Sequence, residues 1–553
     1  MSLSHADVAD YRSKTDKIGE QKMKTQSRQI LKESCSHRVG LFGDIIYRNA
    51  WFYPSREAFI FGDQRVTFEQ YNERVNSLVH ALRDMGVKKG DVLGVLSWNC
   101  PEYMDVFGAA EKGGFIIAPF NARLLLNDFE YLINDSEANT LFVGPEFADT
   151  INTLKPCIPK VKHFISLESS LPGMKRHADL LASYPTSEPD TEVDDEDWLF
   201  IWYTSGTTGR PRGALYNHGR FREEMMCLAR EAPIGPDDKC IAMMPLFHSG
   251  GIALNSYFFH QGATIVNMKF FDPKDLLGAI EKEKITNVAL VPTHLSAMLD
   301  LPDFKKYDTG SIKRIYYAAS PMPKALLVRG IEEFGMVFYQ AYGQAESGPE
   351  ITNLKEKEHD VLDKSPREQQ RLLSCGRPAL GVHVRIVDEN GADVSVGDIG
   401  EIVVMSRHVM NEYWKKPQET KKTIADGWLH TGDMGRYDED GYIYIVDRKQ
   451  DMIISGGENI YPREVEEVLY QHSAVLECAV FGIPDPKWVE AVHAAVSLKK
   501  GAAATPEELI EFCKKNIARY KAPKSIEIMP EIPKGATGKI LKREMKSKYW
   551  AGR

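Results

Sequence analysis

The sequence predicts an α/β protein whose large N-terminal domain contains doubly wound sheets, followed by a β-rich subdomain and a small α+β C-terminal domain. Between residues 58 and 342, short apolar runs alternate with amphipathic stretches, which is typical of strand–helix–strand units with parallel strands. Between residues 382 and 444 the strands are short and alternate in polarity. Asp-Glu-Asn-Gly and Asp-Glu-Asp-Gly turns separate them, which indicates antiparallel hairpins.

Length and composition restrict the class of protein. A chain of 553 residues exceeds one ordinary domain, so we expect at least two. The net charge of −9 argues against nucleic acid as a partner, and no apolar run reaches the roughly eighteen residues of a membrane span. The polar start lacks the apolar centre of a secretory signal. The eight cysteines form no Cys-x-x-Cys pair, which favours reduced thiols in a cytoplasmic protein.

The first clear elements follow a polar leader over residues 1–40, whose role the sequence does not reveal. Thr67 and Gln70 form a capping-box pattern, and apolar residues at helical spacing continue from there to a helix end near Gly86. A strand is expected at 92–96, a helix from Pro101 through Ala110, and a strand at 115–119. Further apolar strands are predicted at 140–143, 163–166, 198–203, 240–245, 263–266, 287–292, 314–319 and 337–342.

The stretch from Tyr203 to Gly213 has the composition of a phosphate-binding loop. It combines four Ser/Thr hydroxyls, three glycines and two arginines, and glycines allow backbone N–H groups to approach an anion closely. It is not a Walker loop, because Pro211 stands where that motif requires its second glycine. A short apolar run and a helix-capping Asn217 follow, so the loop is expected to join two strands. The alternative is a glycine-rich surface loop.

Two further stretches add groups that a nucleotide needs. Tyr342-Gly343-Gln344-Ala345-Glu346 follows a strand, and a carboxylate beside phosphates suits Mg²⁺; the alternative is that Glu346 is an acid in the first turn of a helix. Asp433 after a glycine turn, together with Arg448, can bind ribose hydroxyls and phosphate; the alternative is a surface ion pair.

The last two stretches lie near the C-terminus. Gly456 and Gly457 between a predicted strand and helix allow the close approach of an extended ligand, or form only a tight turn. Lys539 lies on a glycine-flanked loop at the edge of a lysine-rich tail, which is as compatible with a solvated face as with a site. Polar residues 447–451 interrupt two apolar strands and mark the predicted domain boundary.

Together, these motifs resemble the adenylate-forming superfamily of acyl-CoA synthetases, luciferase-like enzymes and nonribosomal adenylation domains, and most resemble acyl- or aryl-CoA ligases. The resemblance runs from about Ala50 to the C-terminus. It implies a leader at 1–40, an N-terminal domain at 41–447 with its β-rich subdomain at about 382–446, a hinge at 448–451 and a mobile lid domain at 452–553. Gln450 is the implied hinge residue.

The resemblance also implies ATP, Mg²⁺ and coenzyme A as the cofactors of a carboxylic acid–CoA ligase. A carboxylate would attack the α-phosphorus of ATP, and a thiol would then displace AMP. Implied phosphate-binding residues are Thr204, Ser205, Gly206, Thr207, Thr208, Gly209 and Arg212. Implied adenine-binding residues are Ala319, Ser320, Pro321, Gln340, Ala341, Tyr342, Gly343 and Gln344. Glu346 would bind the metal, Asp433 and Arg448 the ribose, Lys539 the reacting groups, and Gly456 and Gly457 would face the thiol.

Three positions depart from the pattern of the family. Arg212 stands where lysine is usual, Ala345 where a hydroxyl is usual, and Gln450 where the hinge residue is usually charged. These departures leave open a nucleotide-binding scaffold without catalysis. The acceptor is open as well, because a carrier-protein thiol supplied by another chain would serve as well as coenzyme A.

The substrate acid is not determined by the sequence. Residues 245–251 resemble the family segment that closes the acyl pocket, and His248 within it is either a gate of that pocket or a structural histidine. Tyr316, Tyr317 and Tyr339 are candidates for its lining. Both an aliphatic and an aromatic acid are compatible with these residues. The sequence is also compatible with a homodimer.

Overall fold

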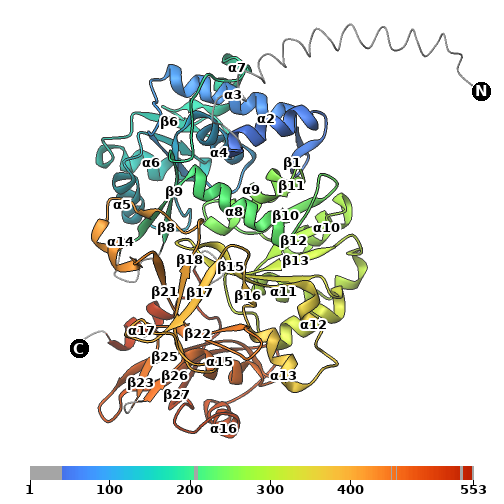
Figure 1. Ribbon diagram of the computed structural model, residues 1–553, viewed down its shortest axis with the longest axis vertical. Helices are drawn as coiled ribbons and strands as arrows, with labels where there is room; N and C mark the ends of the chain where they lie inside the picture. The colour runs from blue at the N-terminus through green and yellow to red at the C-terminus, as the bar shows by residue number, and fades with distance from the viewer. Residues whose placement is uncertain (1–39, 205–209, 450, 456–457, 536–539, 551–553) are drawn as a thin grey trace, which may run out of the picture.

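The computed structural model describes residues 40–204, 210–449, 451–455, 458–535 and 540–550. Figure 1 shows a large body built from the blue, green and yellow elements and a smaller body of red elements at the opposite end. The strands β17, β18 and β21 lie between these two bodies. The predicted fold class is confirmed: the protein contains two large mixed sheets whose strands alternate along the chain, an antiparallel sheet and a separate small C-terminal sheet.

The first large sheet has eight strands in the order β19-β9-β8-β4-β3-β5-β6-β7. Strands β4, β3, β5 and β6 are parallel, as the alternating pattern predicts, whereas β8 and β9 form an antiparallel hairpin. The strands are β3 (Val92–Leu96), β4 (Ile116–Pro119), β5 (Thr140–Val143), β6 (His163–Ser166), β7 (Lys175–Arg176), β8 (Trp198–Thr204), β9 (Arg212–Asn217) and β19 (Glu412–Tyr413).

The second large sheet has nine strands in the order β16-β15-β14-β13-β12-β10-β11-β1-β2, with a parallel centre and antiparallel edges. The strands are β1 (Glu57–Phe61), β2 (Gln64–Thr67), β10 (Lys239–Ala242), β11 (Thr264–Asn267), β12 (Asn287–Leu290), β13 (Arg314–Tyr317), β14 (Phe338–Gln344), β15 (Gly348–Leu354) and β16 (Arg377–Pro378). The sequence predicts a strand that continues to Pro245, but β10 ends at Ala242. Pro245 has no N–H to continue a ladder, and the chain turns there toward the next helix.

Helices join the two sheets through one apolar core. Phe259 of α9 stacks on Phe59 of β1 with ring centroids 5.7 Å apart and meets Tyr71 of α3 at 5.2 Å. The helices of the large body are α2 (Phe42–Phe52), α3 (Phe68–Asp84), α4 (Pro101–Gly113), α5 (Leu126–Ser136), α6 (Ala148–Leu154), α7 (His177–Ser183), α8 (His218–Glu231), α9 (Ser249–His260), α10 (Pro273–Glu283), α11 (Pro292–Leu299), α12 (Lys324–Phe334), α13 (Pro366–Gln369) and α14 (Pro417–Thr423).

The predicted caps are confirmed. Gln70 N donates to Thr67 Oγ1 at 3.2 Å, and Thr67 N donates to Gln70 Oε1 at 2.9 Å, so both bonds of the capping box form. Asn217 caps α8 by accepting from Arg220 N at 2.9 Å. The helix α8 therefore begins directly after Asn217, at His218.

Two smaller sheets follow, the first antiparallel and the second mixed, with one parallel pair of strands. The first contains β17 (His383–Val387), β18 (Gly400–Met405), β21 (Trp428–Tyr437), β20 (Ile424–Ala425) and β22 (Ile443–Arg448). The second contains β24 (Glu458–Ile460), β23 (Ile453–Ser455), β26 (Val489–Leu498), β25 (Val475–Asp485) and β27 (Ser525–Ile528), with helices α15 (Pro462–Tyr470), α16 (Pro506–Asn516) and α17 (Lys542–Trp550). The antiparallel hairpins are confirmed, and the exact domain boundaries stay predictions.

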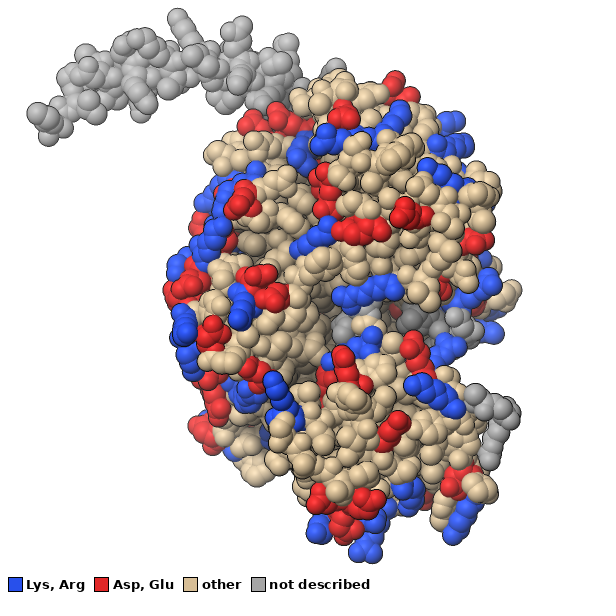
Figure 2. Space-filling model, turned by 180° about the vertical axis from the view of Figure 1, so that it is seen from behind, with Lys and Arg blue, Asp and Glu red and all other residues tan. Residues whose placement is uncertain are grey.

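The surface carries both signs of charge. On the face in Figure 2, acidic and basic side chains are interspersed, and the outline is indented between the large and the small body. Among the described helices, none combines the length and the apolar character needed to cross a membrane. The described cysteines are all unpaired thiols.

Candidate active site

Asp433 and Arg448 form a close pair on neighbouring strands. The register of β21 and β22 places the two residues opposite each other, and Arg448 Nε lies 2.5 Å from Asp433 Oδ1. Asp433 is only 3% exposed, unlike the carboxylate of a surface ion pair. Burial opposes the charge on Arg448, but the charge of Asp433 and its neighbours outweighs burial and raises the pKa of the guanidinium.

Strand β14 supplies two more donors to the same carboxylate. Tyr342 Oη donates to Asp433 Oδ2 at 2.5 Å, and Gln344 Nε2 donates to that oxygen at 2.6 Å. Burial, and then the charge of Asp433, raise the pKa of Tyr342 well above its ordinary value, so the phenol remains a donor. Three motifs that are far apart in the sequence therefore hold one carboxylate in a fixed position, suited to accepting from vicinal hydroxyls.

Glu346 lies at the turn between β14 and β15, so the alternative that it begins a helix is wrong. Its Oε1 accepts from Thr204 Oγ1 at 3.1 Å and from Tyr413 Oη at 2.9 Å. These bonds bring the end of β8, the β14–β15 turn and β19 together. Sequence reasoning missed Tyr413, because nothing around it marks a site; only its pairing with β9 places it there.

Arg212 faces Thr204 across the β8–β9 hairpin, which confirms that the predicted phosphate loop joins two strands. Its guanidinium lies over the ring of Tyr413, 4.3 Å from the centroid, and Nη1 is 3.3 Å from Glu419 Oε2. Its Nε is buried without a hydrogen-bond partner in the part of the chain that is described. Arg212 therefore has one donor unused at the base of the predicted phosphate loop.

The predicted adenine segment follows β13. Ala319 has a φ of +70°, a left-handed conformation that a non-glycine residue rarely adopts and that is found preferentially at functional sites. On the adjacent strand β14, a Cβ atom at Gly343 would lie 2.2 Å from Gly348 O, so only glycine fits there. Gln340 carries a buried Oε1 without a partner in the described residues. Ser320, Pro321 and Ala341 lie beside these positions in the chain.

Several predicted residues lie outside the described part of the chain: Ser205, Gly206, Thr207, Thr208, Gly209, Gln450, Gly456, Gly457 and Lys539. The roles predicted for them stay predictions. Strands β8 and β9 flank the first group, and β23 and β24 flank the glycine pair. His248 is exposed at the start of α9, and its role also stays a prediction.

The small body contacts this region through α15. Arg463 N donates to Asp447 Oδ2 at 2.9 Å, and Arg463 Nη1 donates to Ile445 O at 2.9 Å. Asp447 directly precedes Arg448, so α15 is joined to the strand that carries one member of the predicted ribose site.

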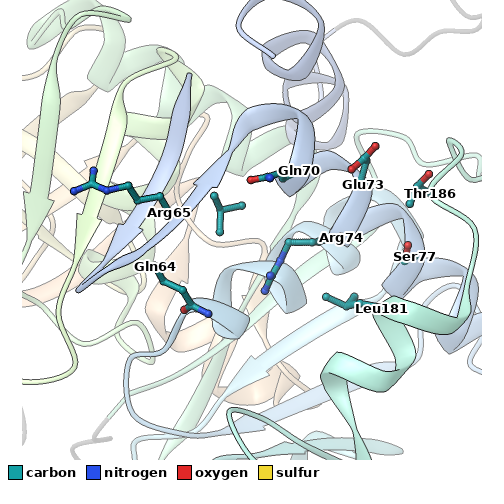
Figure 3. Close-up of a pocket in the computed structure, with 9 residues that line it drawn as sticks. Gln64, Arg65, Gln70, Glu73, Arg74, Ser77, Leu181 and Thr186 are labelled. Carbon is teal, nitrogen blue, oxygen red and sulfur yellow. The ribbon is translucent and has the colours of Figure 1, made fainter. Parts of the chain in front are cut away.

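A pocket of about 380 Å³ lies elsewhere, over β2 and α3 (Figure 3). Its two arginines are already paired: Arg65 with Glu57 and Glu283, and Arg74 with Asp105. These carboxylates neutralise the cations, so the described lining of the pocket offers no unpaired cation for the phosphates of a nucleotide. In the described ranges, no group of three or more His, Cys, Asp or Glu side chains could hold a metal ion by itself. Among the described residues, Glu346 is therefore not part of a cluster of side chains that could hold a metal ion without other ligands.

A buried carboxylate–guanidinium pair, a second carboxylate at the end of β8 and the four sheets agree with the adenylate-forming class that the sequence motifs resemble. The chain belongs to the AMP-binding enzyme family: residues 46–414 match the profile of the AMP-binding enzyme and residues 464–539 match that of its C-terminal domain.

The sequence similarity to known proteins extends over nearly the whole chain. A feruloyl-CoA synthase of an Amycolatopsis species is 33% identical over 91% of this chain and 98% of its own. The medium/long-chain-fatty-acid–CoA ligase FadD8 of Mycobacterium tuberculosis is 32% identical over 98% of this chain and 96% of its own. The crystal structure of the anthranilate CoA ligase AuaEII with anthranoyl-AMP superposes with a TM-score of 0.84 at 28% identity, covering 92% of this chain and 97% of that one.

Proposed function

We propose that the protein is an ATP-dependent carboxylic acid–CoA ligase that forms an acyl-adenylate, releasing first pyrophosphate and then AMP. It is an enzyme of the AMP-forming acid–thiol ligase class. The observation that carries the proposal is the position of two residue pairs around β14. Asp433, which is paired with Arg448, accepts from Gln344 at the end of β14, and Thr204 donates to Glu346 in the turn that directly follows β14.

The nucleotide would be held by groups already fixed in place. Asp433 accepts hydrogen bonds from Tyr342 and Gln344 and would accept from the ribose hydroxyls, while Arg448 would bridge ribose and phosphate. The segments 319–321 and 340–344 would line the adenine. Fixed donors and acceptors of this kind do not have to be ordered when the substrate binds.

Mg²⁺ fits the chemistry of Glu346. The ion takes few protein carboxylates and completes its shell with phosphate oxygens and water, so one carboxylate beside the phosphate loop is enough. Both described hydrogen bonds to this carboxylate end on Oε1, from Thr204 and Tyr413, and they orient it. When bound, the ion would neutralise charge on the phosphates.

The reaction would have two halves. The substrate carboxylate would attack the α-phosphorus of ATP, the bond to pyrophosphate would break, and Lys539 would contact the carboxylate and the α-phosphate. The thiol of coenzyme A would then attack the acyl carbon, and AMP would leave. Rotation of the C-terminal domain about Gln450 would withdraw Lys539 and bring Gly456 and Gly457 to the thiol. The seven cysteines in the described part of the chain are unpaired thiols, which supports a cytoplasmic location for this chemistry.

Two assays test the proposal and its alternatives. Pyrophosphate release should require a carboxylic acid, and AMP release should require coenzyme A. Release of AMP only with a carrier protein would favour the alternative acceptor, and nucleotide binding without either release would favour the scaffold. Changing Lys539 to Ala should abolish adenylation but spare thioester formation from a preformed acyl-adenylate; equal loss in both halves would overturn its assigned role.

The substrate is expected among aliphatic or aromatic acids, because the similar proteins are named for ferulic, fatty and anthranilic acids. Screening pyrophosphate release across short, medium, long-chain and aromatic acids would identify the class. The aromatic residues named as pocket lining divide between two faces: Tyr316 packs on Tyr339, with centroids 5.4 Å apart, whereas Tyr317 Oη donates to His359 Nε2 at 2.9 Å on the other side.

A further inference from the structure

Helix α5 holds both strand ends between which the predicted phosphate loop runs. Tyr131 and Asp135 are one helical turn apart on α5, so their side chains lie on the same face. At the end of β8, Tyr203 Oη donates to Asp135 Oδ2 at 2.8 Å. Just before β9, Pro211 O accepts from Tyr131 Oη at 3.1 Å. The two strands that flank the loop are therefore fastened to one side of one helix.

The carboxylate of Asp135 also reaches the segment that follows β19. Lys416 Nζ lies 3.5 Å from Asp135 Oδ1, and Trp414 Nε1 donates to the backbone oxygen of Asp135 at 2.9 Å. Trp414 N in turn donates to Gly213 O on β9 at 2.7 Å. Helix α5, the β8–β9 hairpin and this segment thus form a connected set, and Asp135 is bonded to all three through its own atoms or those of its partners.

This segment begins with a residue that contacts two groups of the proposed active site. Tyr413 directly precedes Trp414, its hydroxyl donates to Glu346 Oε1 at 2.9 Å, and its ring lies 4.3 Å from the guanidinium of Arg212. A displacement of the segment would therefore move the carboxylate proposed to bind Mg²⁺. Asp135 joins this carboxylate, through the segment, to the base of the predicted phosphate loop.

The charge of Asp135 is balanced by groups that are fixed around it. Burial opposes the charge on Lys416, but Asp135 and Tyr131 outweigh burial and raise the pKa of the ammonium group. Burial, and then the charge of Asp135, raise the pKa of Tyr203 well above its ordinary value, so this phenol remains a donor. Because both of its oxygens already have partners, Asp135 is suited to orient other groups.

We propose that Asp135 is a positioning residue for the β- and γ-phosphates of ATP, and that it acts through Tyr203 and Lys416 by setting the distance between the base of the phosphate loop and Glu346. This inference rests on the proposed function, since it assigns a residue to the same reaction. Small displacements of binding groups are costly where a substrate must be aligned for reaction. AMP carries neither of these two phosphates, so its binding should not depend on Asp135.

The first test measures binding and not turnover. α,β-Methylene-ATP with Mg²⁺ carries the β- and γ-phosphates and cannot release pyrophosphate, whereas AMP lacks both. Each is titrated by calorimetry into the full chain and into Asp135→Ala. We expect the Kd of α,β-methylene-ATP to rise by about tenfold and that of AMP to stay within about twofold. A loss of fold alone would weaken both nucleotides together.

The second test separates the two halves of the reaction. In Asp135→Ala, kcat/KM for ATP in pyrophosphate release should fall by about tenfold or more, because the leaving group is misaligned. Thioester formation from a preformed acyl-adenylate and coenzyme A should stay within about twofold, since pyrophosphate has already left. Asp135→Asn keeps an oxygen for Tyr203 Oη but removes the charge beside Lys416, so its loss should be smaller, about threefold.

Glu188→Ala is the matched control. The side chain of Glu188 is 24% exposed, close to the 17% of Asp135, and it also accepts from a lysine, Lys112, at 2.6 Å. Its other described donors are Asn72 and Asn76 of α3, which lie outside the β8–β9 hairpin. The variant should lower the melting temperature and leave the ratio of the two nucleotide affinities unchanged.

The outcomes separate the inference from the function on which it rests. Equal weakening of both nucleotides in Asp135→Ala, or no weakening of either, overturns the positioning role while the unaltered protein still releases pyrophosphate. If the alanine variant does not fold, Tyr203→Phe removes the bond to Asp135 but keeps the ring, and a selective loss of about threefold for α,β-methylene-ATP is then expected. An unaltered protein that binds neither nucleotide overturns the proposed function and the inference together.

Discussion

The Asp433 region and the region of Glu224, Glu350 and His408 both place carboxylates in the interior, yet they are built in opposite ways. Asp433 is met by Arg448, Tyr342 and Gln344, so it is paired before any ligand binds. Glu224 has neither a cation nor a donor on either of its oxygens in the described part of the chain. A paired carboxylate fixes geometry at low cost, whereas an unpaired one is tolerated only where something else offsets the penalty.

The difference separates groups that are already in place for a ligand from a buried cluster whose groups are mostly unpaired. A nucleotide is the same in every turnover, so its site benefits from a rigid network around Asp433. Breaking each region should therefore have a different signature.

The largest effect is expected at Asp433. Asp433→Ala removes the acceptor and leaves Arg448 and Tyr342 without their partner, so kcat/KM for ATP should fall by about a hundredfold or more. Pyrophosphate release at varied ATP measures it. Asp438→Asn is the control, because Asp438 accepts from Tyr444 Oη in the exposed β21–β22 turn and should leave the activity near that of the parent. Equal losses in both variants would mean that only stability was affected.

Glu350 should make stability depend on pH. Burial raises its pKa from 4.5 to about 7, although bonds from Tyr339 and Asn353 oppose the shift. The folded state then keeps a proton that the unfolded chain releases above pH 4.5, so this residue's contribution to the free energy of unfolding falls as the pH rises from 4.5 to 7. The loss is at most about 3 kcal/mol.

The measurement is the difference in melting temperature between the parent and Glu350→Gln across this pH range. The parent should lose stability relative to the variant as the pH rises, and the difference should level off above pH 7. Glu389→Gln, at an exposed turn, should show no such trend. A difference that grows in favour of the parent with rising pH would contradict the buried, proton-retaining carboxyl.

A smaller effect is expected at Glu346. Glu346→Gln keeps an acceptor for Thr204 and Tyr413 but loses the charge that suits Mg²⁺, so the concentration of Mg²⁺ for half-maximal activity should rise by about tenfold. A titration with Mg²⁺ at saturating ATP shows this. If only the maximal rate falls and the requirement for Mg²⁺ stays constant, Glu346 does not bind the ion.

The smallest effect is expected from Tyr413→Phe. The change removes one of the hydrogen bonds to Glu346 Oε1 but keeps the ring under Arg212, so the loss should be about threefold to tenfold in kcat/KM for ATP. Tyr413→Leu, which also removes the ring, should lose more if the stacked arginine matters. Arg212→Lys tests the same contact from the other side, since lysine cannot stack a planar group on the ring.

Short motifs allowed much of the fold and of the nucleotide site to be predicted. The period of the apolar runs predicts the sheets, because burial on both faces requires continuous apolar strands. Asp433, Arg448 and Glu346 stand in compact segments whose chemistry is readable locally, and the capping box at Thr67 works within one turn. For these features, the information lies within a few neighbouring residues.

The rest was decided only by the tertiary structure. Tyr413 and Glu346 are 67 residues apart, and Thr204 and Glu346 are 142 apart, so no local pattern relates them. Glu224 sits in a helix and Glu350 in a strand, where an isolated acidic residue predicts an exposed side chain. The packing of α8 against β15 buries both carboxyl groups, close enough for the charge of Glu350 to act on Glu224. Burial depends on this packing and not on either residue alone, so no local pattern shows that the two acids form a buried polar cluster.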